Sequence, residues 1–214
     1  MERNLIKNRI RSRIINSNKE NVFIISDFID LGNYDAVKNV LSKLAKEKFI
    51  VRVMRGMYKI PNYNEFLKYE IPASPDAVAR ALARANNWTI GPKGDAALNI
   101  LGISTQVPAV YHYISDGPYK KIEYENVQIV FEKRTNKEIS GYSYKTILII
   151  EAIRTLGPEH MSDSIRKKIL SKCSYEDLIL LNNDGKKSRR WIYEEIKRIL
   201  DMGEFDYVGT STTF

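Results

Sequence analysis

The side chains best suited to chemistry lie on one segment with helical spacing, residues 33–46. Opposite its apolar positions this segment carries amide, hydroxyl and amine groups: Lys38, Asn39, Ser42, Lys43 and Lys46. Asn and Ser can hydrogen-bond to base edges in a DNA groove, and Lys reaches guanine acceptors or phosphates. We therefore expect Asn39, Ser42 and Lys43 to contact bases, and Lys38 and Lys46 to contact phosphates.

Three further cations follow at 50–60, where two β-prone runs are separated by a Gly-containing turn: Arg52, Arg55 and Lys59. Arg52 alternates with two valines, so it faces away from the apolar side of its strand. Arg55 lies at the tip of the hairpin, where an arginine can enter a minor groove. We expect all three to contact DNA. Tyr58 is more typical of a core aromatic than of a DNA contact.

These side chains need a scaffold, and the surrounding pattern indicates a winged helix-turn-helix. A short helix is predicted from an N-cap at Ser26 to a stop at Gly32, followed by a helix over 34–46 with Asn33 as its N-cap. A helix at 5–16 and a strand at 21–25, which pairs with the hairpin, complete the module. This arrangement lays its second helix in a major groove.

The distribution of charge agrees with this assignment. Residues 1–61 contain 13 Lys and Arg against 6 Asp and Glu, a net charge of +7, whereas the other residues contain 21 against 20, a net of +1. A concentrated excess of positive charge is typical of a protein that binds a polyanion. A basic helix face that merely contacts solvent is the alternative.

Composition excludes several other classes of protein. With 43% hydrophobic and 28% charged residues, the 214-residue chain resembles an ordinary globular protein and has no apolar run that could span a membrane. It shows no signal peptide, and its single cysteine, Cys173, fits a reducing compartment, so we expect a cytoplasmic location. With His112 and His160, this cysteine forms no spacing typical of a metal site. No metal or cofactor is expected.

Signatures of catalysis are scarce. The segment 91–95 superficially resembles a phosphate loop, but it lacks the Gly-Lys-Ser/Thr ending and the spacing of one, so a turn that starts a helix is the better interpretation. Cys173 with a histidine could in principle form a nucleophile and base, but no motif supports this. We expect that the protein is not an enzyme and has no catalytic residue.

The fold class expected for the whole chain is α+β in two domains. The winged helix occupies residues 1–61, and a second domain occupies 62–214, with a small sheet over 62–135 and a helical region over 140–205. A short helix is predicted at 63–69 and a longer one that begins at Ser74. A second basic cluster lies in the helical region and is diluted by acidic neighbours: Arg166, Lys167, Lys168, Lys172, Lys186, Lys187, Arg189 and Arg190. It fits a contact to DNA, RNA or protein, and an ordinary helical surface is slightly favoured.

The sequence between about residues 22 and 131 resembles the AbiEi-type antitoxins of type IV toxin–antitoxin systems. In the first domain the resemblance rests on Ser26-Asp27-Phe28, Leu41-Ser42-Lys43-Leu44 and Arg55-Gly56-Met57-Tyr58. In the second it rests on Asp76-Ala77-Val78-Ala79, on the fairly specific run Leu101-Gly102-Ile103-Ser104-Thr105-Gln106-Val107-Pro108, and on Ser115-Asp116-Gly117-Pro118.

This resemblance implies an antitoxin of phage defence and abortive infection. Such a protein binds inverted repeats in its own promoter through the winged helix and represses its own operon. Its C-terminal domain counteracts a nucleotidyltransferase-like toxin, in many cases without a stable complex. No catalytic residue is implied.

Two alternatives remain at this point. The chain could be a stand-alone winged-helix transcription regulator whose second domain senses a ligand or binds a protein. It could also be an enzyme that uses Cys173 or His112 in the second domain.

Overall fold

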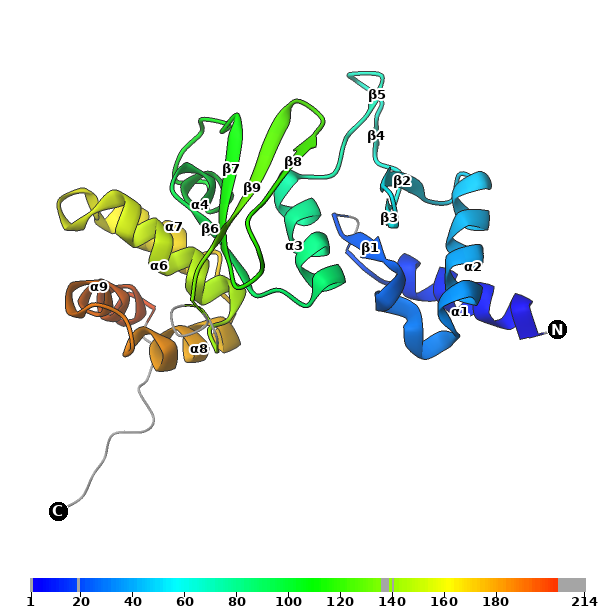
Figure 1. The fold of residues 1–214 in the computed structure, drawn as a ribbon. Helices are drawn as coiled ribbons and strands as arrows, with labels where there is room; N and C mark the ends of the chain where they lie inside the picture. The colour runs from blue at the N-terminus through cyan, green and yellow to red at the C-terminus, as the bar shows by residue number, and fades with distance from the viewer. Residues whose placement is uncertain (1, 19, 136–138, 140, 204–214) are drawn as a thin grey trace, which may run out of the picture. The chain divides into compact units, whose positions relative to one another are not determined.

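A computed structural model of the chain describes residues 2–18, 20–135, 139 and 141–203, and has a mixed α+β fold (Figure 1). The described residues form three small sheets, with orders β1-β3-β2, β4-β5 and β6-β7-β9-β8. The chain divides into two compact units, Met1–Trp88 and Thr89–Phe214. The expected α+β class is confirmed.

The first unit has the element order of a winged helix, followed by a small hairpin and a helix. Its elements are α1 (Glu2–Ile15), β1 (Val22–Ile24), the 3-10 helix η1 (Ile25–Leu31), α2 (Tyr34–Lys46), β2 (Val51–Met54), β3 (Met57–Lys59), β4 (Tyr63–Asn64), β5 (Tyr69–Glu70) and α3 (Pro75–Asn86). The winged helix-turn-helix that the sequence predicted is therefore present.

Helix α2 forms for the local reasons that its sequence indicates. The side chain of Asn33 accepts a hydrogen bond from the backbone N–H of Ala36 at 2.9 Å, which confirms the predicted N-cap. The apolar side is buried by Val37, Val40, Leu41 and Leu44. It packs with Ile10 and Ile14 of α1 in one core, so the polar side of α2 faces away from that core.

The strand at 22–24 pairs with the wing, as predicted. β1 runs antiparallel to β3 with Phe23 opposite Tyr58, and β2 pairs with the other edge of β3. Tyr58 is 2% exposed and belongs to the core, so the core interpretation of this tyrosine is confirmed.

Two local predictions in this unit are wrong. Ser26 is not the N-cap of the short helix; the carboxylate of Asp27 accepts from the N–H of Ile24 at 2.9 Å instead. The predicted helix at 63–69 is the β4–β5 hairpin. There the side chain of Asn64 accepts from the N–H of Leu67 at 2.8 Å, which is a turn that competes with helix formation.

Helix α3 belongs to the first unit. Ser74 caps it by accepting from the N–H of Ala77 at 3.2 Å, as expected. From its last turn, the Arg84 guanidinium donates to the carbonyl of Val22 at 2.7 Å and pairs with Asp27 at 3.2 Å. Because these contacts join α3 to β1 and η1, the compact units divide after Trp88, later than the boundary that the sequence suggested after Pro61.

The second unit contains one mixed sheet and a group of helices. Its described elements are β6 (Ile90–Lys93), α4 (Asp95–Ile100), β7 (Val110–Ser115), β8 (Lys120–Tyr124), β9 (Val127–Lys133), α6 (Tyr144–Leu156), the 3-10 helix η2 (Pro158–His160), α7 (Asp163–Leu170), α8 (Tyr175–Gly185) and α9 (Arg190–Asp201). β7 pairs antiparallel with β6 and parallel with β9, and β8 closes the other edge. Residues 204 and 205, the end of the predicted helical region, lie outside the described part of the chain.

The segment 91–95 is not a phosphate loop, and its glycine has a packing role. Residues 91–93 continue strand β6, and Gly94, at φ +60°, precedes α4. A Cβ atom at Gly91 would lie 1.9 Å from the side chain of Ile147 on α6. Gly91 therefore allows the helix to approach the sheet closely.

Candidate nucleic-acid interface

The polar side of α2 presents the predicted reading residues to solvent. Lys38, Asn39, Lys43 and Lys46 are exposed and Ser42 is half-buried. Within the described part of the chain, no hydrogen bond or ion pair holds Lys38, Asn39, Ser42 or Lys46. These donors and acceptors are therefore available to a ligand, on a helix whose other side is fixed in the core.

The tip of the wing supplies two more available cations. Arg55 is exposed in the turn between β2 and β3, where Gly56 has a φ of +78°. Arg52 is exposed on β2, and its guanidinium carbon lies 5.9 Å from the centre of the Tyr58 ring. A planar cation beside an aromatic ring has few conformations to lose when it binds a phosphate.

The structure corrects one predicted DNA contact, Lys59, because the amine of this residue is bound inside the protein. Its residue is 6% exposed, and its amine donates to the carboxylate of Glu70 and to the carbonyl of Ile71 at the base of the β4–β5 hairpin. The sequence placed Lys59 on the wing with the two arginines. The missing information was the hairpin that follows, which supplies both acceptors and covers the amine.

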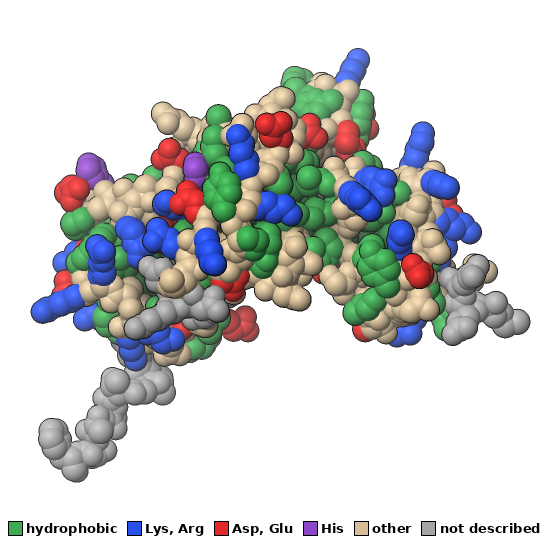
Figure 2. Space-filling view, in the orientation of Figure 1, with side chains coloured by type: hydrophobic (Ala, Val, Ile, Leu, Met, Phe, Trp, Pro, Cys, Tyr) green, Lys and Arg blue, Asp and Glu red, His purple; other side chains and the backbone are tan. Residues whose placement is uncertain are grey.

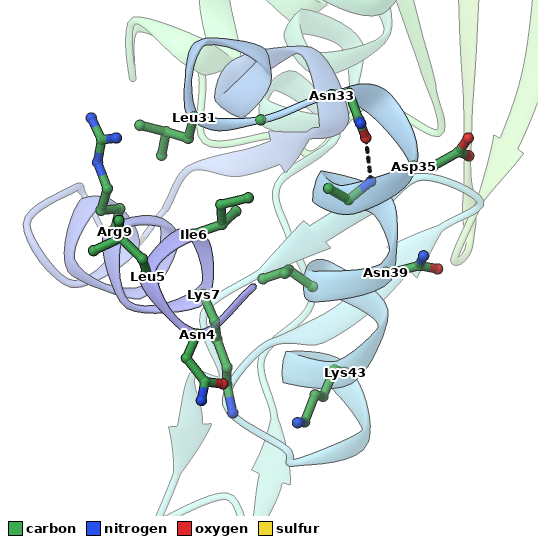
Figure 3. Close-up of a pocket in the computed structure, with 13 residues that line it drawn as sticks. Asn4, Leu5, Ile6, Lys7, Arg9, Leu31, Asn33, Asp35, Asn39 and Lys43 are labelled. Carbon is green, nitrogen blue, oxygen red and sulfur yellow. Dashed lines mark hydrogen bonds between the residues drawn. The ribbon is translucent and has the colours of Figure 1, made fainter. Parts of the chain in front are cut away.

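A groove beside α2 extends the polar surface onto α1. It has a volume of about 680 Å³ and lies between the first half of α1, the end of η1 and the exposed side of α2 (Figure 3). In Figure 3, Lys7, Asn4 and Lys43 extend toward the same side of the groove, whereas Asp35 and Asn39 point away from α1. Lys7 pairs with Glu47 at 2.7 Å, and this hydrogen bond lowers the pKa of that carboxyl below its usual value.

The basic side of α1 is partly used inside the protein. Arg13 forms a two-point contact with Asp30, at 2.7 and 2.6 Å, and the guanidinium of Arg11 lies 4.5 Å from the centre of the Phe49 ring. Arg9 remains exposed at the edge of the groove. The sequence showed the cations of α1, but only the fold separates those that bind within the protein from those that face the groove.

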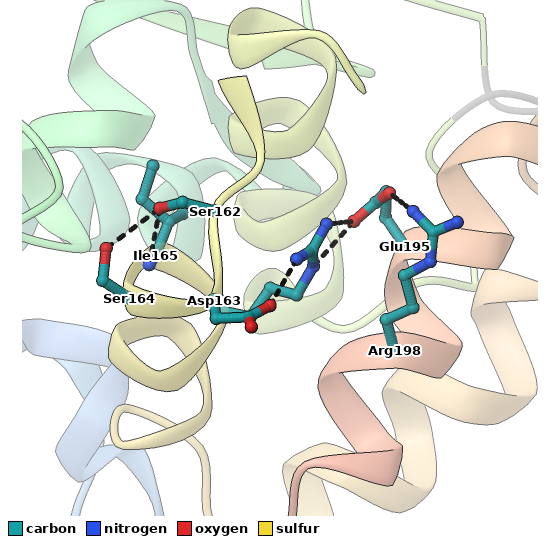
Figure 4. A network of polar contacts seen from close by, with 7 residues as sticks. Ser162, Asp163, Ser164, Ile165, Glu195 and Arg198 are labelled. Carbon is teal, nitrogen blue, oxygen red and sulfur yellow. Dashed lines mark hydrogen bonds and ion pairs between the residues drawn. The ribbon is translucent and has the colours of Figure 1, made fainter. Parts of the chain in front are cut away.

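The second basic cluster is likewise divided between internal and external cations. Arg166 on α7 donates to the buried Glu195 on α9 at 2.8 and 2.9 Å and to Asp163 at 2.7 Å, and Arg198 donates to the same Glu195 (Figure 4). The side chain of Glu195 is 3% exposed. This network joins two helices, so Arg166 has a structural role.

The other cations of the cluster remain at the surface. Lys187 pairs with Asp184 at 3.3 Å and Arg190 with Glu194 at 3.0 Å. Lys186, Lys187 and Arg190 are exposed. The Arg190–Glu194 pair is exposed on both sides, and such a pair contributes little stability and is readily exchanged for a charged partner, whereas Asp184, the partner of Lys187, is buried.

The candidate nucleophile is poorly suited to reaction. Cys173 is half-buried, its thiol donates to the carbonyl of Ile169 at 3.3 Å, and burial raises the pKa of Cys173 to about 11. The thiol therefore stays protonated at neutral pH, and the thiolate is the reactive form.

His112 belongs to a group on the sheet. Its Nδ1 lies 2.8 Å from one oxygen of Glu132, and Lys93 donates to the other oxygen at 2.8 Å. The hydrogen bond from Lys93, assisted by His112, holds the pKa of Glu132 below its usual value. These are cross-strand contacts on β6, β7 and β9: an ion pair between Lys93 and Glu132, and a hydrogen bond between His112 and Glu132.

Two further observations concern metals and membranes. Among the described residues, no three His, Cys, Asp or Glu side chains come together in a way that could hold a metal ion. None of the described helices is long and apolar enough to cross a membrane.

Comparison with known proteins places the chain in a family without assigning an activity. No curated protein matches it. A solved structure that it resembles is the crystal structure of RV2827C protein from Mycobacterium tuberculosis, with a TM-score of 0.38 and 14% identity, over 92% of this chain and 77% of that chain. A likeness of this degree carries no argument about function. The model of DUF6088, a family of unknown function, matches residues 9–178, and the chain therefore belongs to this family.

Proposed function

We propose that this protein binds DNA through α2 and the wing and represses its own operon. The observation that supports this most directly is the exposed side of α2, where Lys38, Asn39 and Lys46 have no partner among the described residues. Arg55 extends the same kind of surface to the wing. Within the first 61 residues the net charge is +7, which favours a polyanionic ligand.

Side chains of α2 would recognise the DNA bases, and the cations around this helix would orient the protein on the DNA. Asn39, Ser42 and Lys43 carry the groups that recognise base edges, because an amide can both donate and accept while an amine finds guanine acceptors. Lys38 on the flank of this side, Lys46 near the end of the helix, and Arg52 on the wing would neutralise phosphates and fix the position of the helix.

We further propose that the protein is an antitoxin and that its second unit counteracts a nucleotidyltransferase-like toxin without acting as an enzyme. The support is the resemblance to AbiEi-type antitoxins, most of all the run from Leu101 to Pro108. The high pKa of Cys173 fits a role that needs no nucleophile.

The same variants can test the two roles in separate experiments, of which the first concerns DNA binding. Binding of the full chain to a duplex from its own promoter is measured by fluorescence anisotropy, for wild type and for Lys43→Ala and Arg55→Ala. Each variant should bind at least tenfold more weakly, whereas Lys121→Ala, an exposed cation on β8, should bind like wild type. If both variants bind like wild type, the assigned face is wrong.

The antitoxin role is tested by co-expressing the same variants with the product of the neighbouring gene. Lys43→Ala and Arg55→Ala should rescue growth as well as wild type, because neither residue lies in the second unit. Failure of the wild-type chain to rescue growth would contradict the antitoxin proposal and leave the proposal of DNA binding intact.

A pocket in the second unit favours the alternative role of a ligand-sensing regulator. It has a volume of about 300 Å³, and its lining combines isoleucines with the cations Arg134, Arg154, Lys187 and Arg189 and with one carboxylate, Glu151, which pairs with Arg154. Such a lining suits a small anion with an apolar part. A rise in the melting temperature with a panel of phosphorylated metabolites, and a change in operator affinity with the same compound, would support this role.

A further inference from the structure

The end of the β4–β5 hairpin exposes several large hydrophobic side chains. Phe66 is 92% exposed, Leu67 and Tyr63 are each 53% exposed, and Tyr69 is 48% exposed. The hairpin extends from the first unit as a narrow projection, with hydrophobic side chains at its surface (Figures 1 and 2). Tyr63 pairs with Glu70 and Tyr69 with Asn64, so the two tyrosines lie on opposite faces of the hairpin, with Phe66 and Leu67 at the turn between them. Single exposed hydrophobic residues are ordinary, but several on one small projection indicate an interaction surface.

The base of this hairpin is fixed. Glu70 accepts from the amine of Lys59 and from the N–H of Asn62 at 2.7 Å, and the N–H of Ile71 donates to the carbonyl of Asn62 at 2.7 Å. The buried amine of Lys59 therefore anchors both strands. A hairpin with such short strands is marginally stable by itself, so this anchor keeps Phe66 in position before it meets a partner.

The charges at the tip suit a second copy of the same hairpin. Glu65 and Lys68 flank Phe66 and Leu67, and in the described structure neither charge is held by a hydrogen bond or an ion pair. The charge of Glu70 is already balanced by Lys59. The tip thus has no net charge with which to select an acidic or a basic partner. In a dimer with two-fold symmetry, however, Glu65 of each copy would face Lys68 of the other copy, which gives two pairs of opposite charge.

We propose that the tip of this hairpin, residues 63–69, is a self-association surface, with Phe66 of two copies at its centre. At about 150–250 Å² for each large side chain, Phe66, Leu67 and the tyrosine of one face correspond to about 300–450 Å² per copy and about 600–900 Å² for two. This area is below the size of a stable interface, so the dimer is weak and depends on concentration. The proposal does not depend on the proposed DNA binding.

Sedimentation velocity of the full chain at about 1–200 μM, a span chosen around the micromolar affinities of small interfaces, tests the proposal. The wild type should shift from monomer toward dimer, and Phe66→Ser should dimerise at least tenfold more weakly. Tyr119→Ser removes another exposed aromatic, 65% exposed and located in the second unit, and should behave like wild type. A wild type that stays monomeric throughout, or a Phe66→Ser variant that dimerises unchanged, overturns the proposal.

Exchange of the two charges tests the symmetry without altering the hydrophobic contact. Glu65→Lys and Lys68→Glu should each weaken the dimer, because each places like charges opposite one another. An equimolar mixture of the two variants should form a heterodimer at least as stable as the wild-type dimer. If the mixture associates no better than either variant alone, the two-fold arrangement is wrong. Association of the chain with another protein through Phe66, in place of a second copy, would also overturn it.

Discussion

The salt dependence of the proposed DNA binding gives a quantitative test of which cations contact the DNA. Each phosphate that a protein neutralises contributes about −0.9 to the slope of log K against log salt concentration. Lys38 and Lys46 are exposed on α2 and have no partner among the described residues, whereas Lys59 is 6% exposed and bonded to Glu70 and Ile71. The first two should contribute to the slope, and the third should not.

The variant Lys38→Ala/Lys46→Ala should therefore have a slope about 1.8 less steep than wild type, from two contacts at about 0.9 each. Over a fourfold increase in salt, the wild type should lose about 12-fold more affinity than the variant, by the same relation. Lys59→Met should keep the wild-type slope. This variant should instead have a lower free energy of unfolding, because Glu70 is left without its cation.

Fluorescence anisotropy with a labelled promoter duplex, at several salt concentrations and with measured stoichiometry, provides the slopes. Thermal unfolding of the same proteins separates lost contacts from lost folding. An unchanged slope for Lys38→Ala/Lys46→Ala would refute the assignment of phosphate contacts to α2. A flatter slope for a fully folded Lys59→Met would mean that Lys59 reaches DNA, and that the burial of its amine does not describe the bound protein.

Three other predictions concern the second unit. Arg166→Met should lower the free energy of unfolding by about 3 kcal/mol in urea titrations, because the buried Glu195 then keeps only the contact from Arg198. Arg190→Met breaks an exposed pair and should lower the free energy of unfolding by less than about 1 kcal/mol. Equal losses for the two variants would contradict the structural role of Arg166. Gly91→Ala should lower the melting temperature by several degrees, because the added carbon would lie 1.9 Å from the side chain of Ile147 on α6. An unchanged melting temperature would show that α6 can move away from the sheet. Cys173 should react with a thiol reagent at pH 8 about a hundredfold more slowly than a free cysteine, because its raised pKa leaves little thiolate at that pH. The reaction should become faster as the pH approaches 11. A rate equal to that of a free cysteine would contradict the burial of the thiol.

Much of the winged-helix scaffold could be predicted because its signals are local. The N-cap at Asn33, the stripe from Val37 to Leu44 and the turn at Gly56 depend on residues within a few positions of one another. The elements they specify form with bounds close to those predicted. The same locality explains the failure at 63–69, where the side chain of Asn64 directs the chain into a turn although the spacing of apolar residues suggested a helix.

The sequence by itself determined where the positive charge is concentrated, which helix carries polar side chains opposite its core, and which run resembles an antitoxin. The tertiary structure decided which cations are free. Lys59 and Arg166 look as available in the sequence as Lys46 does, yet the first is held by Glu70 and the second by Glu195, from segments that follow later in the chain. A charge binds an external ligand or an internal partner according to which acceptors the fold brings within about 3 Å of it, and such contacts depend on the whole fold.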